Sequence, residues 1–169
     1  ADGRLSPDNA VEADIDNPNS YTLETGDLLF ARSGATVGKT YMYEESHGPC
    51  IFAGYLIRFR LRREIVDPRF VFYFTQSTIY HNWIDGRKRV AAQPNVNGSE
   101  YASLIIPVPP LSEQRRIVDI LDQADALRRQ RAETDAKVVR ILSTLFYRIF
   151  GDPVANPKGW PIAEMRDLF

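Results

Sequence analysis

The chain has 169 residues, of which 44% are apolar, 25% charged and 11% aromatic, and its formal net charge at pH 7 is −1. This composition is that of a globular protein and excludes disordered, collagen-like and low-complexity classes. One cysteine and two histidines exclude a disulfide framework and a cysteine- or histidine-rich metal site, so we expect no metal.

The charge is unevenly distributed along the chain. Residues 1–29 contain seven acidic side chains and one basic, whereas residues 30–111 contain ten basic and six acidic. A near-neutral total argues against a generic polycation but allows a local basic face that could bind nucleic acid. The sequence has no apolar run of about 18 residues and no evident signal peptide at its start. We therefore expect a cytoplasmic protein that does not enter a membrane.

Three segments predict strands. Residues 28–31 form a short apolar run, which indicates a buried strand, and residues 41–43 suit a return strand after a glycine-containing turn. In residues 55–62, Ile57, Phe59 and Leu61 alternate with Arg58, Arg60 and Arg62, which predicts a strand with one apolar and one basic face. The arginines could follow a phosphate backbone, but a solvated face paired with the acidic N-terminal stretch is the favoured interpretation.

One helix is predicted next. Asp67 and Pro68 form a typical helix start, and the apolar residues that follow at helical spacing extend to Ile84. Asp85 and Gly86 are predicted to end it. A polar, basic loop is expected over residues 87–98, and residues 104–108, which contain a proline, are expected to form an edge strand.

A long helix is predicted over residues 112–150, with Ser112 as its N-cap. No glycine or proline interrupts this range. A helix of this length in so short a chain should pair with another helix, in this chain or another. Residues 151–169 are expected to be loop-rich. The expected partner-binding face is apolar with a spacing of three or four, and it comprises Ile117, Leu121, Ala124, Val138, Leu142, Leu145 and Ile149.

The segment from Gly34 to Thr40 superficially suggests a phosphate-binding P-loop. The P-loop requires four residues between its glycines, but only three separate Gly34 from Gly38, and no convincing crossover helix follows. A hairpin turn is the favoured interpretation. A nucleotide-binding enzyme, and a loop that presents Lys39 to a nucleic-acid phosphate, stay as alternatives.

The predicted loop after Gly86 combines basic side chains, which can neutralise phosphates, with amides, which can pair with base edges. A hydrophilic surface loop is the competing interpretation. The sequence contains no convincing catalytic constellation, and Cys50 lies in an apolar stretch typical of a core position. The candidate DNA-binding residues are Arg32, Ser33, Lys39, Arg87, Lys88, Arg89, Gln93, Asn95 and Asn97.

These motifs together resemble the specificity subunits of type I restriction-modification systems. The stretch GDLLFARSGATVGK at residues 26–39 is similar to a core strand and glycine loop of that family. The stretch QPNVN at residues 93–97, followed by IPVPPLSEQRRIV at residues 106–118, resembles the end of a target recognition domain and the start of its conserved helix. FGDP at residues 150–153, with NPKGWP at residues 156–161, is similar to the entry to a further domain.

The resemblance implies an α+β fold: part of a target recognition domain (1–111) with a small mixed or antiparallel sheet and one helix, a coiled-coil-type spacer helix (112–150), and the start of a second recognition domain or a tail (151–169). Such subunits read half of a split double-stranded DNA site with each recognition domain. Their long helices pack as an antiparallel coiled coil, which sets the spacer length and docks the methyltransferase subunits.

The resemblance also implies which parts of the complex carry chemistry. This chain would be non-catalytic and without a cofactor, whereas S-adenosylmethionine, ATP and magnesium belong to the modification and restriction subunits. A full subunit is more than twice as long as this chain, so the long helix could also pair with a second copy. A coiled-coil interaction module without DNA binding of its own is the alternative function.

Overall fold

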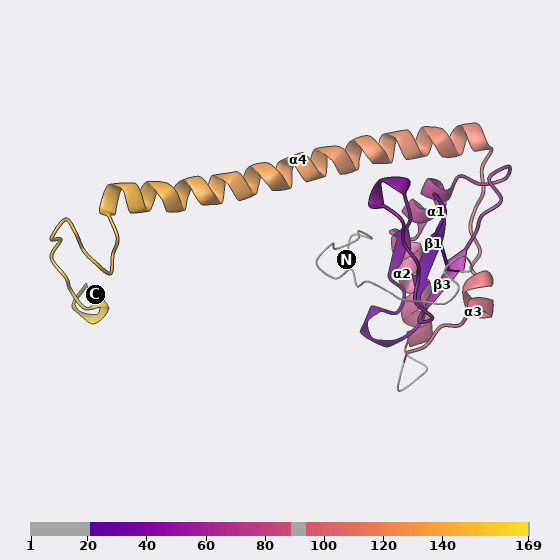
Figure 1. The fold of residues 1–169 in the computed structure, drawn as a ribbon, viewed down its shortest axis with the longest axis horizontal. Helices are drawn as coiled ribbons and strands as arrows, with labels where there is room; N and C mark the ends of the chain where they lie inside the picture. Colours follow the sequence, from indigo (N-terminus) through magenta and orange to yellow (C-terminus); the bar gives the residue numbers. More distant parts are fainter. Residues whose placement is uncertain (1–20, 89–93, 169) are drawn as a thin grey trace. The chain divides into compact units, whose positions relative to one another are not determined.

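A computed structural model describes residues 21–88 and 94–168 (Figure 1). Contacts divide the chain into a first unit that ends at Leu121 and a second unit that begins at Asp122. Within the described residues, no helix combines the length and apolar character that a membrane crossing requires. The two units are described in turn.

The first unit is built on a three-stranded antiparallel sheet, ordered β2-β1-β3, whose strands are β1 (Leu28–Ala31), β2 (Thr40–Met42) and β3 (Leu56–Phe59). Leu28 pairs with Met42 on one side and with Phe59 on the other. All four residues of the central strand are buried. The predicted small sheet is therefore confirmed, although β3 is shorter than the predicted strand over residues 55–62.

The core occupies the sheet face from which Leu28 and Phe30 project. These two side chains pack with Val71, Tyr80 and Ile84 from the helices. Ile57 and Phe59 of β3 pack against this cluster, as their alternation with the arginines predicts. The opposite face has a smaller cluster of Leu23, Leu29 and Tyr43, against which the half-buried Cys50 packs.

Two helices replace the single one predicted after Asp67: α1 (Pro68–Phe74) and α2 (Thr78–Lys88). Asp67 caps α1 as predicted, because its side chain accepts a hydrogen bond from the Arg69 amide. The helix breaks at buried Thr75, whose hydroxyl donates to the Phe72 carbonyl and contacts Thr40 Oγ1 at 2.7 Å. Hydroxyl groups that bond to the backbone compete with helix continuation, which explains the break.

The predicted helix end at residues 85–86 was also wrong. Helix α2 continues through Gly86, which costs only about 1 kcal/mol relative to alanine in an exposed helix interior, so Arg87 and Lys88 lie in its last turn and not in a loop. The short helix α3 (Gly98–Ala102) follows, so among the described residues before α4 three α-helices are found where one was predicted.

No strand forms over residues 104–108, where an edge strand was predicted. Pro107 lies within this segment, and Pro109 and Pro110 follow it. Pro107 lacks the N–H that a sheet ladder uses, and the two prolines that follow limit the extension of any strand. The segment instead leads directly to the long helix.

The long helix is α4 (Leu111–Phe150), which has 40 residues and is uninterrupted (Figure 1). It begins one residue before the predicted N-cap Ser112. It ends at Gly151, whose positive φ of 87° suits glycine. The tail returns to this end, because Trp160 Nε1 donates to the Phe150 carbonyl at 3.1 Å. A short 3-10 helix, η5 (Met165–Leu168), lies in the otherwise irregular tail.

Candidate nucleic-acid interface

The glycine segment between β1 and β2 is a closed turn built around the 3-10 helix η3 (Gly34–Thr36). The amides of Val37, Gly38 and Lys39 donate to the carbonyls of Gly34, Ala31 and Thr36, respectively. These donors are therefore engaged within the loop, whereas a P-loop directs them to phosphate. An antiparallel strand, not a helix, follows the loop. This geometry agrees with a hairpin turn and contradicts a P-loop.

Two buried tyrosines hold this glycine loop in place. Tyr80 donates its hydroxyl hydrogen to the Gly38 carbonyl, and Tyr101 donates to the Ala31 carbonyl, each at 2.8 Å. Burial raises the pKa of the Tyr101 hydroxyl to about 12 and raises the pKa of Tyr80 as well, so both remain donors at neutral pH. Tyr80 is one of the apolar residues at helical spacing before Ile84 that predicted the helix after Asp67, whereas the sequence pattern did not identify Tyr101.

Gly38 allows the loop to approach α2 closely. Its φ is +86°, and a Cβ at this position would lie 2.6 Å from Ile84 Cγ2. A larger residue would therefore be both sterically and conformationally unfavourable. Lys39, directly after this contact, has an exposed side chain, so its ammonium group is available to a partner while its backbone is fixed.

Arg32, Ser33 and Asn95 are brought together at the end of β1. An isolated antiparallel bridge joins Ser33 to Asn95, and the Val96 amide donates to the Arg32 carbonyl at 2.8 Å. The side chains of Ser33 and Asn95 are exposed. A hydroxyl and an amide are thus presented side by side on a fixed backbone, which suits hydrogen bonding to nucleic-acid groups.

The basic residues at the end of α2 have internal contacts of their own. The Arg87 guanidinium carbon lies 3.5 Å from the centre of the Trp83 ring, and Arg87 Nη1 donates to the Trp83 carbonyl. Lys88 Nζ lies 3.3 Å from Asp85 Oδ1. Stacking fixes the orientation of Arg87, whereas Asp85 neutralises part of the charge of Lys88.

Asn97 caps α3. Its side chain accepts a hydrogen bond from the Glu100 amide, and the Glu100 carboxylate accepts one from the Asn97 amide, which forms a capping box. This contact occupies the side-chain oxygen of Asn97. The remaining two candidates, Arg89 and Gln93, lie outside the described residues.

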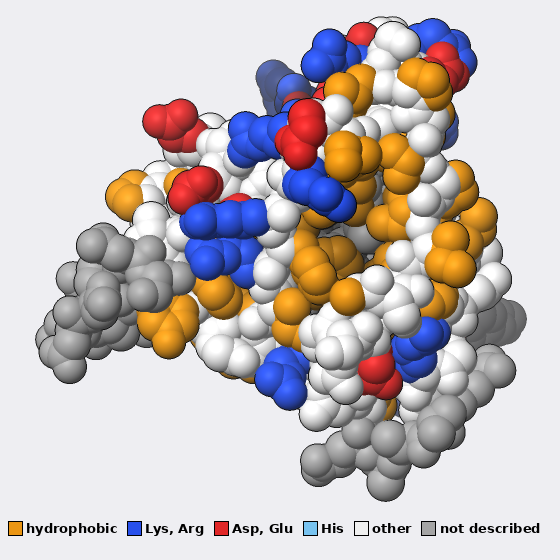
Figure 2. All heavy atoms as spheres, turned by 90° about the vertical axis from the view of Figure 1, so that its right-hand side faces the viewer, with side chains coloured by type: hydrophobic (Ala, Val, Ile, Leu, Met, Phe, Trp, Pro, Cys, Tyr) orange, Lys and Arg blue, Asp and Glu red, His pale blue; other side chains and the backbone are white. Residues whose placement is uncertain are grey.

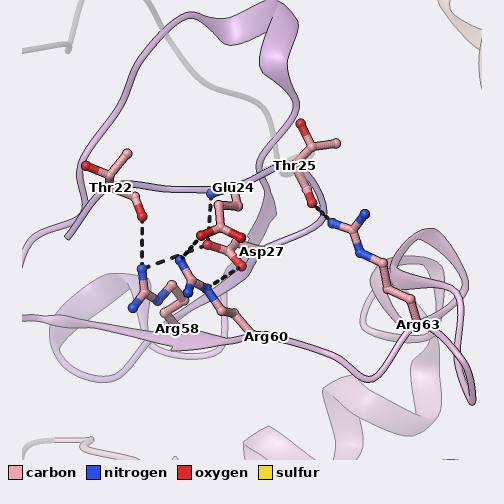
Figure 3. Close-up of polar contacts among 7 residues, drawn as sticks. All are labelled: Thr22, Glu24, Thr25, Asp27, Arg58, Arg60 and Arg63. Carbon is pink, nitrogen blue, oxygen red and sulfur yellow. Dashed lines mark hydrogen bonds and ion pairs between the residues drawn. The ribbon is translucent and has the colours of Figure 1, made fainter. Parts of the chain in front are cut away.

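The arginines of β3 and the segment after it are tied to the acidic stretch that precedes β1 (Figure 3). Asp27 lies 3.9 Å from Arg58 and 3.4 Å from Arg60, and Glu24 lies 2.7 Å from Arg60. Arg63 donates to the Thr25 carbonyl. These contacts favour the structural interpretation of the predicted basic face over a phosphate-binding role.

A different face of the first unit is apolar. Figure 2 views the molecule from the side on which the segment between α3 and α4 runs, and hydrophobic side chains gather across the middle of this view. Within the first unit, Ile65, Ile105 and Val108 are exposed. On this face the hydrophobic side chains are bordered by basic and acidic ones (Figure 2).

Gln114 joins the start of α4 to the sheet-bearing part of the first unit, a role that sequence reasoning missed. Its side chain is fully buried and makes three hydrogen bonds. Its Nε2 donates to the carbonyls of Ile65 and Pro109, and its Oε1 accepts from the Asp67 amide. The sequence did contain a signal for this role, because Gln114 is a polar residue on the buried side of an amphipathic helix.

The predicted partner-binding residues of α4 fall into two groups. Ile117 and Leu121 are half-buried, and Val118 beside them is buried. The others are exposed: Ala124, Val138, Leu142, Leu145 and Ile149. The second half of the helix therefore presents apolar side chains to its surroundings. No cluster of three or more potential metal ligands occurs among the residues that the structure covers.

A family model described as "Type I restriction modification DNA specificity domain" matches residues 3–144. A putative type I restriction enzyme MjaX specificity subunit from Methanocaldococcus jannaschii is 32% identical over 113 residues, which are 63% of this chain and 26% of that protein. The EcoKI specificity subunit of Escherichia coli K12 is 24% identical over 140 residues, 78% of this chain and 30% of that protein. The chain thus spans under a third of these relatives.

Solved structures agree with this likeness. A chain from a study of complex assembly and conformational transition of the type I R-M system has a TM-score of 0.57 at 25% identity, over 84% of this chain and 36% of that one. The HsdS subunit from Thermoanaerobacter tengcongensis has a TM-score of 0.50 at 22% identity, over 87% of this chain and 38% of that one, and supports the fold alone.

Proposed function

The chain belongs to the type I restriction-modification DNA specificity domain family, and we propose that its first unit reads half of a split double-stranded DNA site. The observation that carries this proposal is the family match over residues 3–144. The exposed hydroxyl, amide and ammonium groups of Ser33, Asn95 and Lys39 support it, because they lie on backbone fixed by hydrogen bonds.

The proposed division of labour follows from side-chain chemistry. Lys39 and the basic residues at and after the end of α2 contact phosphates and supply affinity. Ser33 and Asn95 lie at the start of the glycine loop that carries Lys39, and they contact base edges, which gives sequence preference. Arg32, next to Ser33 in the chain, contributes to this contact with DNA. Arg58 and Arg60 take no part, because Asp27 and Glu24 already pair with them.

We further propose that α4 docks methyltransferase subunits of a type I complex, and through them the restriction subunit. The exposed apolar side chains of its second half support a docking role. In this proposal the chain itself catalyses no reaction, and S-adenosylmethionine, ATP and magnesium bind to the partner subunits. DNA as the binding partner implies a cytoplasmic location.

The main test replaces Arg87, Lys88 and Arg89 with alanine in the full chain, assembled with methyltransferase subunits. We expect weaker binding to duplex DNA and a log–log salt slope that is smaller in magnitude by about 2 to 3, since each lost phosphate contact contributes about 0.9. Titrations at several salt concentrations measure both quantities. Sequencing the duplexes retained from a random-site library identifies the recognised sequence.

A matched control replaces Arg129, Lys137 and Arg140, three exposed cations of α4, with alanine. This variant loses the same charge but should keep the wild-type salt slope. We call the variant that lacks Arg87, Lys88 and Arg89 the Arg87 variant. If its salt slope equals that of the wild type, the end of α2 does not belong to the DNA contact surface.

The second candidate function is a protein-interaction module in which α4 alone acts. The exposed apolar stripe of α4 favours it. Docking of methyltransferase subunits without any DNA contribution from the first unit would support this candidate. In that case the Arg87 variant and its control would behave alike in every DNA measurement.

A further inference from the structure

Arg87, in the last turn of α2, is held by two contacts to one residue. Its guanidinium carbon lies 3.5 Å from the centre of the Trp83 ring, so the planar group lies over a face of the indole. Its Nη1 also donates a hydrogen bond to the Trp83 carbonyl. The two residues are four positions apart, which places their side chains on the same face of the helix. Trp83 therefore fixes both the position and the plane of the guanidinium.

Trp83 is itself held by the core. Its half-buried side chain packs against the main core cluster. Its ring centre lies 6.3 Å from that of Tyr80, with an angle of 19° between the planes, and 5.9 Å from that of Tyr101. These two tyrosines also donate the hydrogen bonds that hold the glycine loop. One aromatic cluster therefore supports both Arg87 and the loop that carries Lys39.

The contacts to Trp83 leave a paired set of donors on Arg87. The N–H groups of Nε and Nη2 lie parallel on one edge of a guanidinium. Within residues 21–88 and 94–168, neither of these nitrogens makes a hydrogen bond. Two parallel donors match two oxygens of one phosphate group. Because the group is already oriented, it loses less conformational freedom when it binds.

Lys88, the next residue, lacks this orientation. Its Nζ lies 3.3 Å from Asp85 Oδ1, and both side chains are at least a third exposed, so the ion pair is weak. An ammonium group has no plane and can rotate its donors freely. Lys88 can therefore supply charge to a partner but cannot supply a fixed pair of donors.

We propose that Trp83 is a positioning residue for DNA binding, which holds Arg87 so that Nε and Nη2 donate together to one backbone phosphate. This inference rests on the proposed DNA-binding function of the first unit and specifies one of its contacts. Trp83 itself does not touch the DNA. Arg87 contributes charge and orientation, whereas Lys88 contributes charge alone.

Substitutions that keep the charge test the proposal in the full chain, assembled with methyltransferase subunits. Arg87→Lys removes the planar fork, and Trp83→Leu removes the aromatic face. Each should raise the dissociation constant for duplex DNA by about three- to tenfold and leave the salt slope unchanged, because no charge is lost. Trp83→Phe retains a ring and should bind within about twofold of the wild type. The double variant W83L/R87K should bind no more weakly than Arg87→Lys alone, because both changes remove the same contact.

Two control variants separate positioning from general packing and from charge. Phe74→Leu removes another half-buried ring that packs against the same core cluster, and it should leave the dissociation constant unchanged. Lys88→Arg keeps the charge of the neighbouring residue and should also leave it unchanged. Circular dichroism checks that each variant is folded. If Phe74→Leu weakens DNA binding as much as Trp83→Leu does, loss of packing explains the effect and the proposal is wrong.

Fluorescence of the chain without DNA tests the contact directly. The sequence has two tryptophans, so in a Trp160→Phe background the emission comes from Trp83. Arg87→Lys should shift this emission to longer wavelength, because water replaces the guanidinium over the ring. Lys88→Arg should leave it unchanged. Unchanged emission in Arg87→Lys would overturn the proposed positioning.

The DNA titrations distinguish this inference from the proposed function. They use a duplex of the sequence retained from the random-site library and a duplex of scrambled sequence, and a phosphate contact predicts the same fold loss on both. A loss confined to the retained sequence would identify Arg87 as a base-reading residue and overturn the phosphate contact. Additive losses in W83L/R87K would overturn the role of Trp83 and leave the proposed function intact. Failure of the wild-type assembly to bind either duplex would instead overturn the proposed function, and this contact with it.

Discussion

Apolar side chains are buried in the first unit and exposed in the second. Leu28 in β1 is 0% exposed, whereas Leu142 in α4 is 63% exposed. Leu28 belongs to a continuous apolar run and Leu142 to the apolar stripe of an amphipathic helix, so the two side chains have the same chemistry and differ in what covers them. The apolar face of the sheet is covered by α1, α2 and α3, whereas the apolar stripe on the second half of α4 is exposed in the part of the chain that the structure describes.

Polar side chains differ between the two units in the same way. In the first unit, Gln114 and Asp27 are buried and bonded to backbone or to arginine. In the second unit, the side chains of Arg131 and Asp135 are 85% and 71% exposed. Buried polar contacts therefore stabilise the first unit internally, whereas solvent screens the attraction between Arg131 and Asp135.

The largest expected effect separates the two regions through one substitution made in each. Leu28→Ala should lower the free energy of unfolding by about 3 to 4 kcal/mol, because it leaves a cavity in a packed core. Leu142→Ala should leave the free energy of unfolding of the first unit unchanged and should instead weaken the proposed docking of α4 to its partner subunits. Urea titration, followed through Trp83 fluorescence in a Trp160→Phe background, measures the first unit. Equal unfolding free energies for the two variants would contradict the contrast.

A second pair compares glutamines. Gln114→Ala removes three hydrogen bonds and leaves three backbone groups without this partner: the Asp67 amide and the carbonyls of Ile65 and Pro109. We therefore expect the free energy of unfolding to fall by about 2 to 4 kcal/mol. Gln123→Ala, at an exposed position of the same helix, should change stability by less than about 0.5 kcal/mol. The same urea titration applies. A small loss for Gln114→Ala would mean that α4 is not anchored through this side chain.

Much of the first unit was predictable from local patterns. The apolar run at residues 28–31 identified β1, because a strand buried on both faces is apolar throughout, and the alternation after Tyr55 identified β3, because a half-buried strand has a period of two. Asp67 followed by Pro68 identified the start of α1. The absence of glycine and proline between Ser112 and Phe150 identified α4 to within one residue at its start.

The errors have different physical causes. The hydroxyl of Thr75 bonds to the Phe72 carbonyl where the predicted helix breaks, and it also contacts Thr40, which is 35 residues away and absent from the local pattern. Residues 104–108 have the composition of a strand, but Pro107 lacks the N–H that a sheet ladder uses. Gly86 does not stop α2, because glycine in an exposed helix interior costs only about 1 kcal/mol relative to alanine.

The candidate site was predictable in part. The proximity of Ser33 to Asn95 follows from a bridge between segments 62 residues apart, and both had been selected only for their side-chain chemistry. The capping role of Asn97 was readable from Glu100 three residues later. The roles of Tyr101 and Gln114 require the fold, because their partners are backbone carbonyls and amides elsewhere in the chain.

The smallest expected effect concerns the acidic residues in Figure 3. Glu24 lies closer to Arg60 than Asp27 does, at 2.7 Å against 3.4 Å, but the Glu24 side chain is 68% exposed and that of Asp27 is 4% exposed. Solvent screens an exposed pair, whereas a buried carboxylate that loses its charge leaves its partners unsatisfied. Asp27→Asn should therefore cost about 1 to 2 kcal/mol, and Glu24→Gln less than about 0.5 kcal/mol.

The urea titration measures both variants, and the order of the two losses is the informative result. If burial governs these contacts, the variant with the longer ion pair is the less stable one. A larger loss for Glu24→Gln would mean that distance outweighs burial at this site. It would also mean that the arginines of this segment remain solvated enough to contact a phosphate backbone, which would return them to the candidate DNA surface.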